Sequence, residues 1–331
     1  MLRVGVIGTG VMGSGHARYL TEHVSDAEVV ALSDIDLNRA KQLATQIKTP
    51  QLVTSDVNEL FMSELVDAVI IASPDNLHVE HLRLAITAGK PTLCEKPIAT
   101  SIEEARCIAK EIRDFQRNTG KELIHFGFMR RFDPQYRKVR DLINSGDFGS
   151  PLFIRVVTRN VASTGATDNG LYTNIAIHDF DIFRWMFNSD FVQVESHYPK
   201  RNSLSLPGLS DPLIITAKLE NGIMMIADIV AFNNYGYDAR FEILCEKGSI
   251  EVGIFGDVIT RINFEATPIL GGHMANNWME RFERSYIEEV NTWVTSIISG
   301  VVNKDLATVE DALAANEACQ MGVNSMKIKP R

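Results

Sequence analysis

Short apolar runs alternate with amphipathic stretches through the first part of the chain. Runs of four to six residues between glycine and polar residues are typical of buried parallel strands, because both faces of such a sheet are covered. We expect strands at 2–7, 28–32, 67–72, 91–94 and 122–126. Helical spacing between them predicts helices at 11–24, 37–47, 78–88 and 101–117, the last opened by a capping box of Ser101 and Glu104. This alternation predicts a doubly wound parallel sheet.

The pattern changes beyond residue 127. Asp133 and Pro134 are typical of a helix start, and we expect that helix to end near Gly146. Runs of β-forming residues follow at 152–159, 192–198, 213–219, 222–232, 239–246, 249–255 and 258–264, with a hairpin signal at Asn221-Gly222. They predict one antiparallel sheet. Two long helices are expected at 278–299 and 308–326.

The two patterns predict an α/β protein of two domains. The length of 331 residues also favours two, since a common domain has roughly 150 residues. We expect the first domain over 1–126 and the second over 127–331, with the alternative that a terminal helix returns to the first.

Charge and cysteine content restrict the class of protein. The net charge is −9 and no run of Lys and Arg exceeds two residues, which argues against nucleic acid or a membrane surface as a partner. The apolar runs are shorter than the ~18 residues of a membrane helix, and the N-terminus has no signal-peptide pattern. Four scattered cysteines without a C-x-x-C pair favour free thiols: Cys94, Cys107, Cys245 and Cys319. We therefore expect a cytoplasmic protein that acts on small molecules.

A glycine motif lies where the first strand meets the first helix. Gly8, Gly10 and Gly13 match G-x-G-x-x-G. In this motif the first glycine allows a tight turn, the second lets a pyrophosphate approach the backbone, and the third lets helix and strand pack closely. Val11 and Met12 begin the helix, whose N-terminus attracts an anion.

Asp34 supports the same interpretation. It lies 21 residues after Gly13, just past the second strand, where a carboxylate can bind the adenosine ribose diol. The same carboxylate repels a 2′-phosphate, and neither Ile35 nor Asp36 offers a cation to neutralise one. We therefore predict NAD, in preference to NADP, as the cofactor.

Two further segments follow strands, at the edge where open α/β sheets bind ligands. Ser73, Pro74, Asn76 and His78 are expected beside the dinucleotide. Pro74 is alternatively a simple turn residue, and His78 a cap or packing residue. Lys96, within Glu95-Lys96-Pro97, is predicted to point toward the same crevice, and its alternative is a solvated surface charge.

His178 is the candidate for chemistry in the second domain. Helical spacing around it predicts a core face of Ala176, Phe180, Phe183 and Phe187. His178 lies on a neighbouring stripe, where it can simply hydrogen-bond Asp181. A metal site with Asp179 and Asp181 is poorly supported, because adjacent residues diverge on a helix.

Together these motifs resemble the glucose–fructose oxidoreductase/inositol dehydrogenase/rhizopine catabolism family. The resemblance rests on the glycine motif, Glu95-Lys96-Pro97, and His178-Asp179-Phe180-Asp181 followed by Arg184-Trp185. Other stretches resemble the inositol dehydrogenase branch: 127–133, 198–200, 206–207, 235–238, and Trp278 with Arg281, Phe282 and Tyr286. The family implies a Rossmann domain followed by a C-terminal α/β domain with a large open, mainly antiparallel sheet, which is often buried in homo-tetramers.

The resemblance also implies NAD-dependent oxidation of a ring hydroxyl of a small polyol or sugar. An alcohol loses a hydride readily only if its proton leaves too, so a base is needed. His178 is the implied base, and Lys96 holds the hydroxyl and stabilises the developing alkoxide. Glu95 and Lys96 are expected to contact the cofactor as well. The implied substrate-binding residues are Lys96, Met129, Arg130, Asn160, Asn174, His178, Tyr235 and Tyr237.

Asn174 departs from the family pattern. The position four residues before the histidine is normally aspartate in inositol dehydrogenases, and asparagine cannot supply the negative charge that stabilises imidazolium. We expect His178 to remain the base, with Asn174 orienting the substrate. A different inositol isomer, another polyol or slow catalysis are the alternatives.

Oxidation of myo-inositol or scyllo-inositol to the ketone is the favoured function. An aldose or anhydrosugar oxidoreductase of the same family would share the NAD site. A non-catalytic NAD-binding regulator or a structural component of an oligomer would share the fold. Retention of both Lys96 and His178 argues against the regulator.

Overall fold

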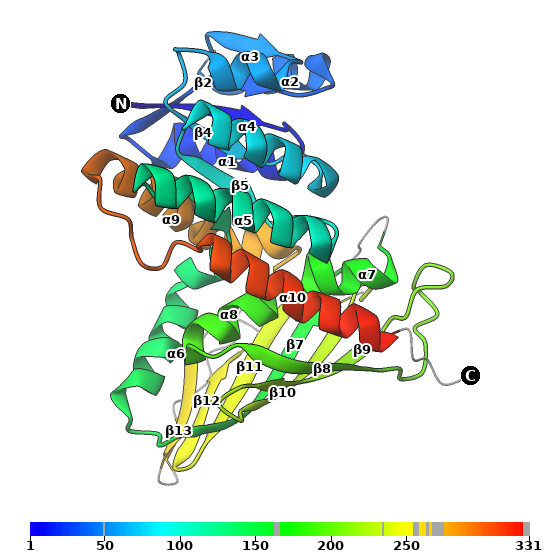
Figure 1. Cartoon of the computed structure of the whole chain (residues 1–331). Helices are drawn as coiled ribbons and strands as arrows, with labels where there is room; N and C mark the ends of the chain where they lie inside the picture. Colours follow the sequence, from blue (N-terminus) through cyan, green and yellow to red (C-terminus); the bar gives the residue numbers. More distant parts are fainter. Residues whose placement is uncertain are drawn as a thin grey trace. The chain divides into compact units, whose positions relative to one another are not determined.

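The chain folds around two β-sheets, one parallel and one mixed (Figure 1). The structure is a computed structural model that describes residues 1–48, 50–161, 166–233, 235–253, 258–262, 265–266 and 275–326. The residues divide into two units, of which the first is Met1–Met129 with Arg284–Asn316 and the second Arg130–Glu283 with Glu317–Arg331. Helices α9 (Trp278–Ser299) and α10 (Val309–Met326) each contribute residues to both units.

The first unit contains a six-stranded sheet in the order β3-β2-β1-β4-β5-β6, in which every pair is parallel. Its strands are β1 (Leu2–Ile7), β2 (Ala27–Ser33), β3 (Leu52–Thr54), β4 (Ala68–Ile71), β5 (Thr92–Glu95) and β6 (Ile124–Gly127). Strands β4 to β6 are buried along their whole length, as expected where helices cover both faces. The strand order reverses between β1 and β4, and open sheets of this kind bind ligands at the carboxyl ends beside that reversal. The predicted doubly wound sheet is confirmed.

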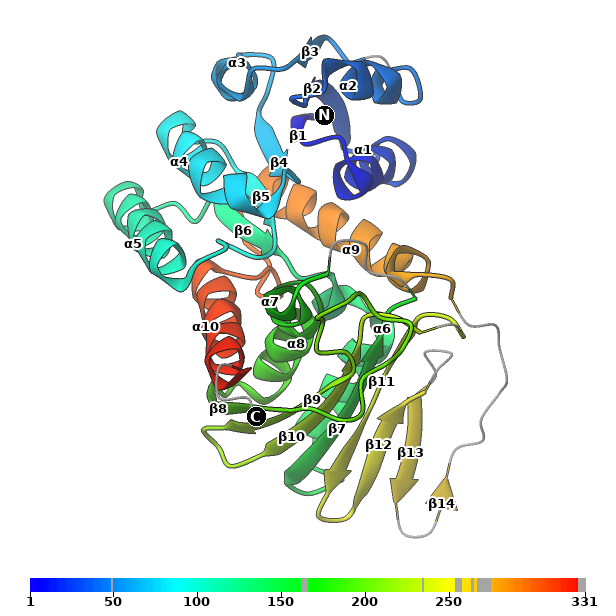
Figure 2. The ribbon, with the colours of Figure 1, turned by 90° about the vertical axis from the view of Figure 1, so that its right-hand side faces the viewer.

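Helices lie on both faces of the parallel sheet. They are α1 (Val11–His23), α2 (Leu37–Ala44), α3 (Val57–Met62), α4 (His78–Ala88) and α5 (Ile102–Thr119), with a 3-10 turn, η1, at Asp75–Leu77. Figure 2 shows α4 and α5 on one side of the sheet and α1 and α9 on the other. The rings of Tyr19 in α1 and Tyr286 in α9 stack with centroids 6.2 Å apart. Ser101 caps α5 by accepting a hydrogen bond from the Glu104 amide, as the sequence predicts.

The sequence pattern does not predict β3 or α3. They contain three and six residues. Such short elements present too few positions for a period of two or of 3.6 to be recognised. Tertiary contacts stabilise them, since β3 pairs with β2, and Leu60 of α3 packs under Gly5.

The second unit contains an eight-stranded sheet in the order β14-β13-β12-β11-β7-β10-β9-β8. Its strands are β7 (Pro151–Arg159), β8 (Phe191–His197), β9 (Leu213–Leu219), β10 (Met224–Val230), β11 (Asp238–Cys245), β12 (Gly248–Val252), β13 (Val258–Ile262) and β14 (Glu265–Ala266). Every pair is antiparallel except β7 and β10, so the predicted mainly antiparallel sheet is confirmed. The predicted strand ends at 254–255 and 263–264 lie outside the described residues.

Helices of the second unit pack on one face of this sheet. They are α6 (Pro134–Ser145), α7 (Asp168–Gly170) and α8 (Ile177–Phe187), with a 3-10 turn, η2 (Met129–Phe132), before α6 and a π-helical segment, η3 (Leu171–Ala176), before α8. Asp133 caps α6 by accepting from the amides of Gln135 and Tyr136. The ring of Phe241 in β11 packs against the rings of Tyr136 in α6 and Phe183 in α8, with centroids 5.0 and 5.1 Å apart. Both helices therefore bury the same face of the sheet (Figure 2).

Candidate active site

The glycine turn between β1 and α1 has the backbone that a dinucleotide site needs. Gly8 has φ +83°, and a Cβ atom there would lie 2.4 Å from the Ala72 carbonyl oxygen. A Cβ atom on Gly13 would lie 1.7 Å from the Gly8 carbonyl oxygen. Gly10, in contrast, faces open space and caps α1 without a side chain. The first amides of α1 thus point toward a position that a pyrophosphate can approach.

Asp34 follows β2 and is buried beside this turn. One carboxylate oxygen accepts from the amide and hydroxyl of Thr9, at 2.7 and 2.8 Å. The other accepts from the Asp36 amide and the Arg39 guanidinium, both at 2.9 Å. Burial alone would raise the pKa of the Asp34 carboxyl, but these hydrogen bonds and the charge of Arg39 lower it below its usual value.

The segment after β4 is folded over the carboxyl end of the sheet. Pro74 and Asn76 are exposed, whereas Ser73 is buried and its hydroxyl lies 2.9 Å from Nδ1 of His81. His78 is also buried, with Nδ1 2.7 Å from the Pro97 carbonyl oxygen and Nε2 3.0 Å from the Ser73 carbonyl oxygen. Both nitrogens of His78 therefore contact the protein itself, which agrees with a packing role more closely than with a direct contact to the dinucleotide.

Lys96 follows β5 and is half-buried. The preceding Glu95 is buried, and its carboxylate lies 2.8 Å from Nε2 of His16. In the sheet Glu95 pairs with Gly127, where a Cβ atom would lie 3.1 Å from that carboxylate. The absence of a side chain at Gly127 therefore leaves room for Glu95.

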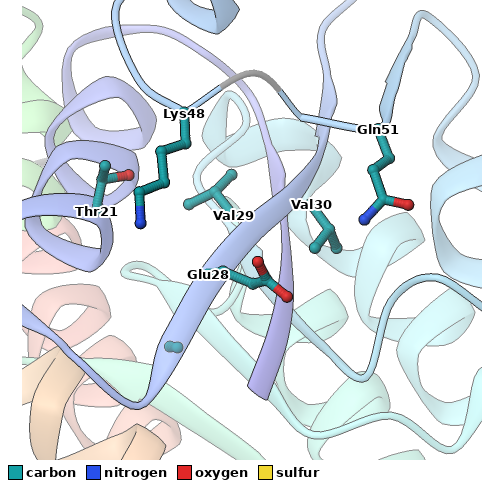
Figure 3. A pocket seen from close by; sticks show the side chains of 7 residues that line it. Thr21, Glu28, Val29, Val30, Lys48 and Gln51 are labelled. Atoms are coloured by element: carbon teal, nitrogen blue, oxygen red, sulfur yellow. The ribbon is translucent and has the colours of Figure 1, made fainter. Parts of the chain in front are cut away.

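A small pocket elsewhere in the first unit does not belong to this site. Its volume is about 60 Å³, and Figure 3 shows the polar ends of Thr21, Glu28, Lys48 and Gln51 around Val29 and Val30. None of these residues belongs to the glycine turn, and the space holds only one or two waters, at about 30 Å³ each.

In the second unit, His178 is half-buried in the first turn of α8, directly after η3. Short π-helical segments often occur at functional positions. Asn174 lies within η3 and is exposed. Of the predicted core residues, Ala176, Phe180 and Phe183 are buried, whereas Phe187, in the last turn of α8, is only half-buried.

Two buried arginines pair with aspartates at the third and fifth residues of α8. Arg130 donates to Asp179, which also accepts from the Thr158 hydroxyl at 3.1 Å. Arg131 donates to Asp181 from Nε at 2.9 Å. Burial alone would lower the pKa of Arg130, but Asp179 raises it well above its ordinary value. The guanidinium therefore stays charged, and this pair fixes the residue next to His178.

The remaining predicted substrate residues differ in exposure. Met129, Arg130 and Tyr237 are buried, and the ring of Phe282 lies against both Tyr237 and Arg130.

Tyr235 is 49% exposed. Its hydroxyl donates to Asp238 at 2.8 Å and accepts from Arg159 at 2.7 Å. Asn160 is half-buried at the end of β7. Of the predicted substrate residues of the second unit, Tyr235 and Asn174 are therefore exposed, Asn160 and His178 are half-buried, and Arg130 and Tyr237 are buried.

No metal site is formed by the residues that the structure describes, where no cluster of three or more His, Cys, Asp and Glu side chains is arranged to hold an ion. The weakly supported site with His178 is also disfavoured by the arginine partners of Asp179 and Asp181.

Sequence reasoning missed several residues that complete these arrangements. Arg39 supplies the cation near Asp34 that neither Ile35 nor Asp36 offers. His16 lies three residues after Gly13 in α1. Residues with that spacing share one face of a helix, so the sequence could have placed His16 on the face of Gly13. Thr158, the partner of Asp179, comes from β7 and leaves no local signal in the sequence.

A parallel sheet of this strand order, a glycine turn with an open second glycine, and a buried carboxylate after β2 are typical of a dinucleotide-binding domain. Residues 2–118 match the model of an oxidoreductase family with an NAD-binding Rossmann fold, and residues 136–251 match the GFO/IDH/MocA C-terminal domain. The chain belongs to the GFO/IDH/MocA oxidoreductase family, and its cofactor is NAD.

Named relatives span the whole chain. Inositol 2-dehydrogenase 2 of Saccharopolyspora erythraea is 36% identical over 335 residues, which cover 99% of this chain and 95% of that protein. Inositol 2-dehydrogenase of Acidothermus cellulolyticus is 32% identical and covers 98% and 93%. The crystal structure of myo-inositol dehydrogenase from Lactobacillus casei with NAD(H) and myo-inositol superposes with a TM-score of 0.89, at 26% identity and 100% and 96% coverage. None of the described helices has the length and apolarity needed to cross a membrane.

Proposed function

We propose that this protein oxidises a secondary hydroxyl of a cyclic polyol, myo-inositol or scyllo-inositol, to the ketone. The observation that supports this most directly is the 36% identity to an inositol 2-dehydrogenase over 99% of the chain. The similar fold of a myo-inositol dehydrogenase that binds NAD(H) and myo-inositol supports the same substrate class.

The residues of the first unit fit NAD. Gly10 leaves the backbone open above the N-terminus of α1, where the pyrophosphate binds, and Asp34 receives the adenosine ribose. Ser73, Pro74 and Asn76 border the same edge of the sheet. When bound, NAD supplies the hydride acceptor.

Residues of the chain remove the hydroxyl proton and stabilise the negative charge that develops on the oxygen. His178 takes the hydroxyl proton, so that the carbon–oxygen bond can become a double bond as the hydride leaves. The ammonium of Lys96 holds that oxygen and stabilises its negative charge before the proton transfer is complete. Asn160, Asn174 and Tyr235 hydrogen-bond the other hydroxyls, since a polyol needs several fixed partners for recognition.

A substitution at Asn174 tests the role proposed for this position beside the base His178. It is exposed in η3, four residues before His178, and its amide can orient a hydroxyl without adding charge. We expect Asn174→Asp to change turnover or isomer preference while leaving the NAD dissociation constant unchanged, as seen by calorimetry. An unchanged rate and an unchanged preference would exclude the position from the chemistry.

The deciding experiment is NADH formation, followed by absorbance. The purified protein is supplied with NAD or NADP and with myo-inositol, scyllo-inositol, chiro-inositol or simple aldoses. We expect rapid NAD-linked turnover of one inositol. Turnover of an aldose alone would assign the protein to an aldose or anhydrosugar oxidoreductase. Calorimetric binding of NAD without any turnover would favour a non-catalytic regulator.

We further propose that the protein is a homo-oligomer, a tetramer in the simplest case. The sheet face opposite α6 and α8 carries half-exposed apolar side chains, among them Met224 and Ile226 of β10 at 39% and 38% exposure. Apolar side chains gathered on one face are typical of a surface that another protein covers. A cytoplasmic location accords with four free cysteines, of which Cys94, Cys245 and Cys319 are buried.

A further inference from the structure

The short segment Glu95–Ala99 carries Lys96 out of the parallel sheet. A lysine has a flexible side chain of four carbons, so its ammonium can be placed accurately only if the backbone at its root is fixed. Three buried side chains from three helices of the first unit contact this segment at alternate residues: Glu95, Pro97 and Ala99.

The first contact is made by His16 of α1. Its side chain is 0% exposed, and Nε2 lies 2.8 Å from the carboxylate of Glu95. The rings of Tyr19 and Tyr286 meet the His16 ring edge to face, at 6.4 and 6.0 Å. These rings fix the orientation of the imidazole, and the imidazole in turn fixes the residue before Lys96.

The second contact is made by His78, at the first position of α4. Its ring lies between the Pro97 carbonyl oxygen at 2.7 Å and the Ser73 carbonyl oxygen at 3.0 Å. Carbonyl oxygens only accept hydrogen bonds, so His78 donates to at least one of them in either protonation state, and to both as imidazolium. The ring ties the residue after Lys96 to the end of β4.

The third contact is made by Asn316 of α10. The side chain is 6% exposed, and Nδ2 donates to the Ala99 carbonyl oxygen at 2.8 Å. A buried backbone carbonyl outside a sheet needs such a hydrogen-bond donor, because leaving it unsatisfied is destabilising. Ala99 is itself 1% exposed.

We propose that His16, His78 and Asn316 are positioning residues that act through Lys96. They hold the backbone on both sides of the lysine and so set where its ammonium meets the substrate hydroxyl. The proposal rests on the proposed function, in which Lys96 contacts the reacting oxygen. It assigns no direct contact with cofactor or substrate to the three side chains.

Steady-state kinetics on matched variants test the proposal. His78→Leu removes the donor, His78→Gln retains one, and Asn316→Ala breaks a separate contact from another helix. We expect His78→Leu and Asn316→Ala to lower kcat by roughly tenfold or more, since misplacement of a catalytic group by 1 Å can cost 10²-fold. His78→Gln should recover part of the loss. The NAD dissociation constant should stay within about twofold, because uniform binding is not affected. His23→Gln, an exposed change on α1, is the control.

A double-mutant cycle separates positioning from general damage. In a Lys96→Met background the lysine can no longer be misplaced, so His78→Leu and Asn316→Ala should lower the residual turnover by less than about twofold. A further tenfold loss in that background would overturn the proposal, because the residues would then act independently of Lys96.

Hydrogen exchange supplies a readout that does not depend on turnover. We expect peptides covering 92–101 to exchange at least several-fold faster in His78→Leu and Asn316→Ala than in the parent chain, with peptides of β1 unchanged. Unchanged exchange in this segment would overturn the proposal. If the parent chain oxidises no polyol, the proposed function fails, while the exchange result still decides whether these side chains hold the segment.

Discussion

At the scale of single residues, the candidate cofactor site of the first unit contains a buried carboxylate with fixed hydrogen-bond partners. Asp34 has hydrogen bonds to both oxygens, and Arg39 is one of the donors. The side chain of Arg39 is 49% exposed, so its pair with Asp34 adds little stability by itself. The position of Arg39 bears instead on cofactor choice, because its guanidinium lies where the 2′-phosphate of NADP would need a cation.

Asp34→Ala should therefore change cofactor choice. We expect the affinity for NAD to fall by between about 10-fold and about 150-fold, because a charged hydrogen bond to the ribose diol contributes about 1.5–3 kcal/mol. NADP should bind more tightly than in the parent, since the repelling carboxylate is gone and Arg39 remains. Titration calorimetry with both cofactors measures this. Asp34→Ala with Arg39→Ala is the control, and a retained NADP gain in the double variant would contradict the role given to Arg39.

Lys96→Ala is the direct test of the proposed electrostatic group. We expect turnover to fall by a factor of ~10² or more, because stabilisation of the developing alkoxide is lost. NAD binding should remain, since the glycine turn and Asp34 are unchanged. Stopped-flow absorbance of NADH formation measures the loss. Near-normal rates would remove Lys96 from the mechanism.

At the scale of elements, burial within one strand gives the protein a pH-dependent stability. His125 in β6 is buried, and desolvation lowers its pKa to about 4. Its Nε2 lies 3.8 Å from the carboxylate of Glu122, too far for a hydrogen bond. The histidine of the unfolded chain titrates near 6.5. The unfolded state therefore takes up a proton between these two values that the folded state does not.

His125→Leu should flatten the dependence of stability on pH. In the parent chain the free energy of unfolding falls as the pH drops from about 6.5 toward 4, by roughly 2 kcal/mol at pH 5 from this residue. Above 6.5 the residue adds no pH dependence. Urea denaturation at pH 7.5 and pH 5 measures the difference, with the exposed His23→Leu as control. An equal fall in both variants would contradict the assignment to His125.

At the scale of the whole molecule, the second sheet carries the surface at which we propose that copies of the chain associate. Its side chains alternate between a face buried by α6 and α8 and a face that is half-exposed. On β10, Met225, Ala227 and Ile229 are buried, while Met224 and Ile226 point the other way. The second face is the proposed contact between copies of the chain.

Ile226→Lys should reduce the size of the oligomer. A buried lysine without a partner is strongly unfavourable at an interface, whereas the same side chain in a monomer would stay in water. Light scattering coupled to size exclusion measures the mass of each species. Glu28→Lys, a charge change in the first unit, is the control. A tetramer that persists with Ile226→Lys would place the interface elsewhere.

The sequence by itself determined the features that depend on neighbours along the chain. The glycine turn, the caps at Ser101 and Asp133 and the alternation of strands with helices follow from backbone conformation and periodicity within a few residues. For this reason the doubly wound sheet, NAD and the family could all be predicted from it. The short β3 and α3 could not, because their stability comes from packing partners.

Only the tertiary structure decided which distant residues meet. His16 and Glu95 are 79 positions apart, and Asn316 and Ala99 are 217 apart, so no local pattern connects them. The parallel pairing of β7 with β10 and the pairing of Arg130 with Asp179 likewise depend on how elements pack. These polar side chains are buried, and a polar side chain removed from water is stable only if a protein group replaces its hydrogen bonds to water. The partner that the fold supplies therefore decides what each side chain does.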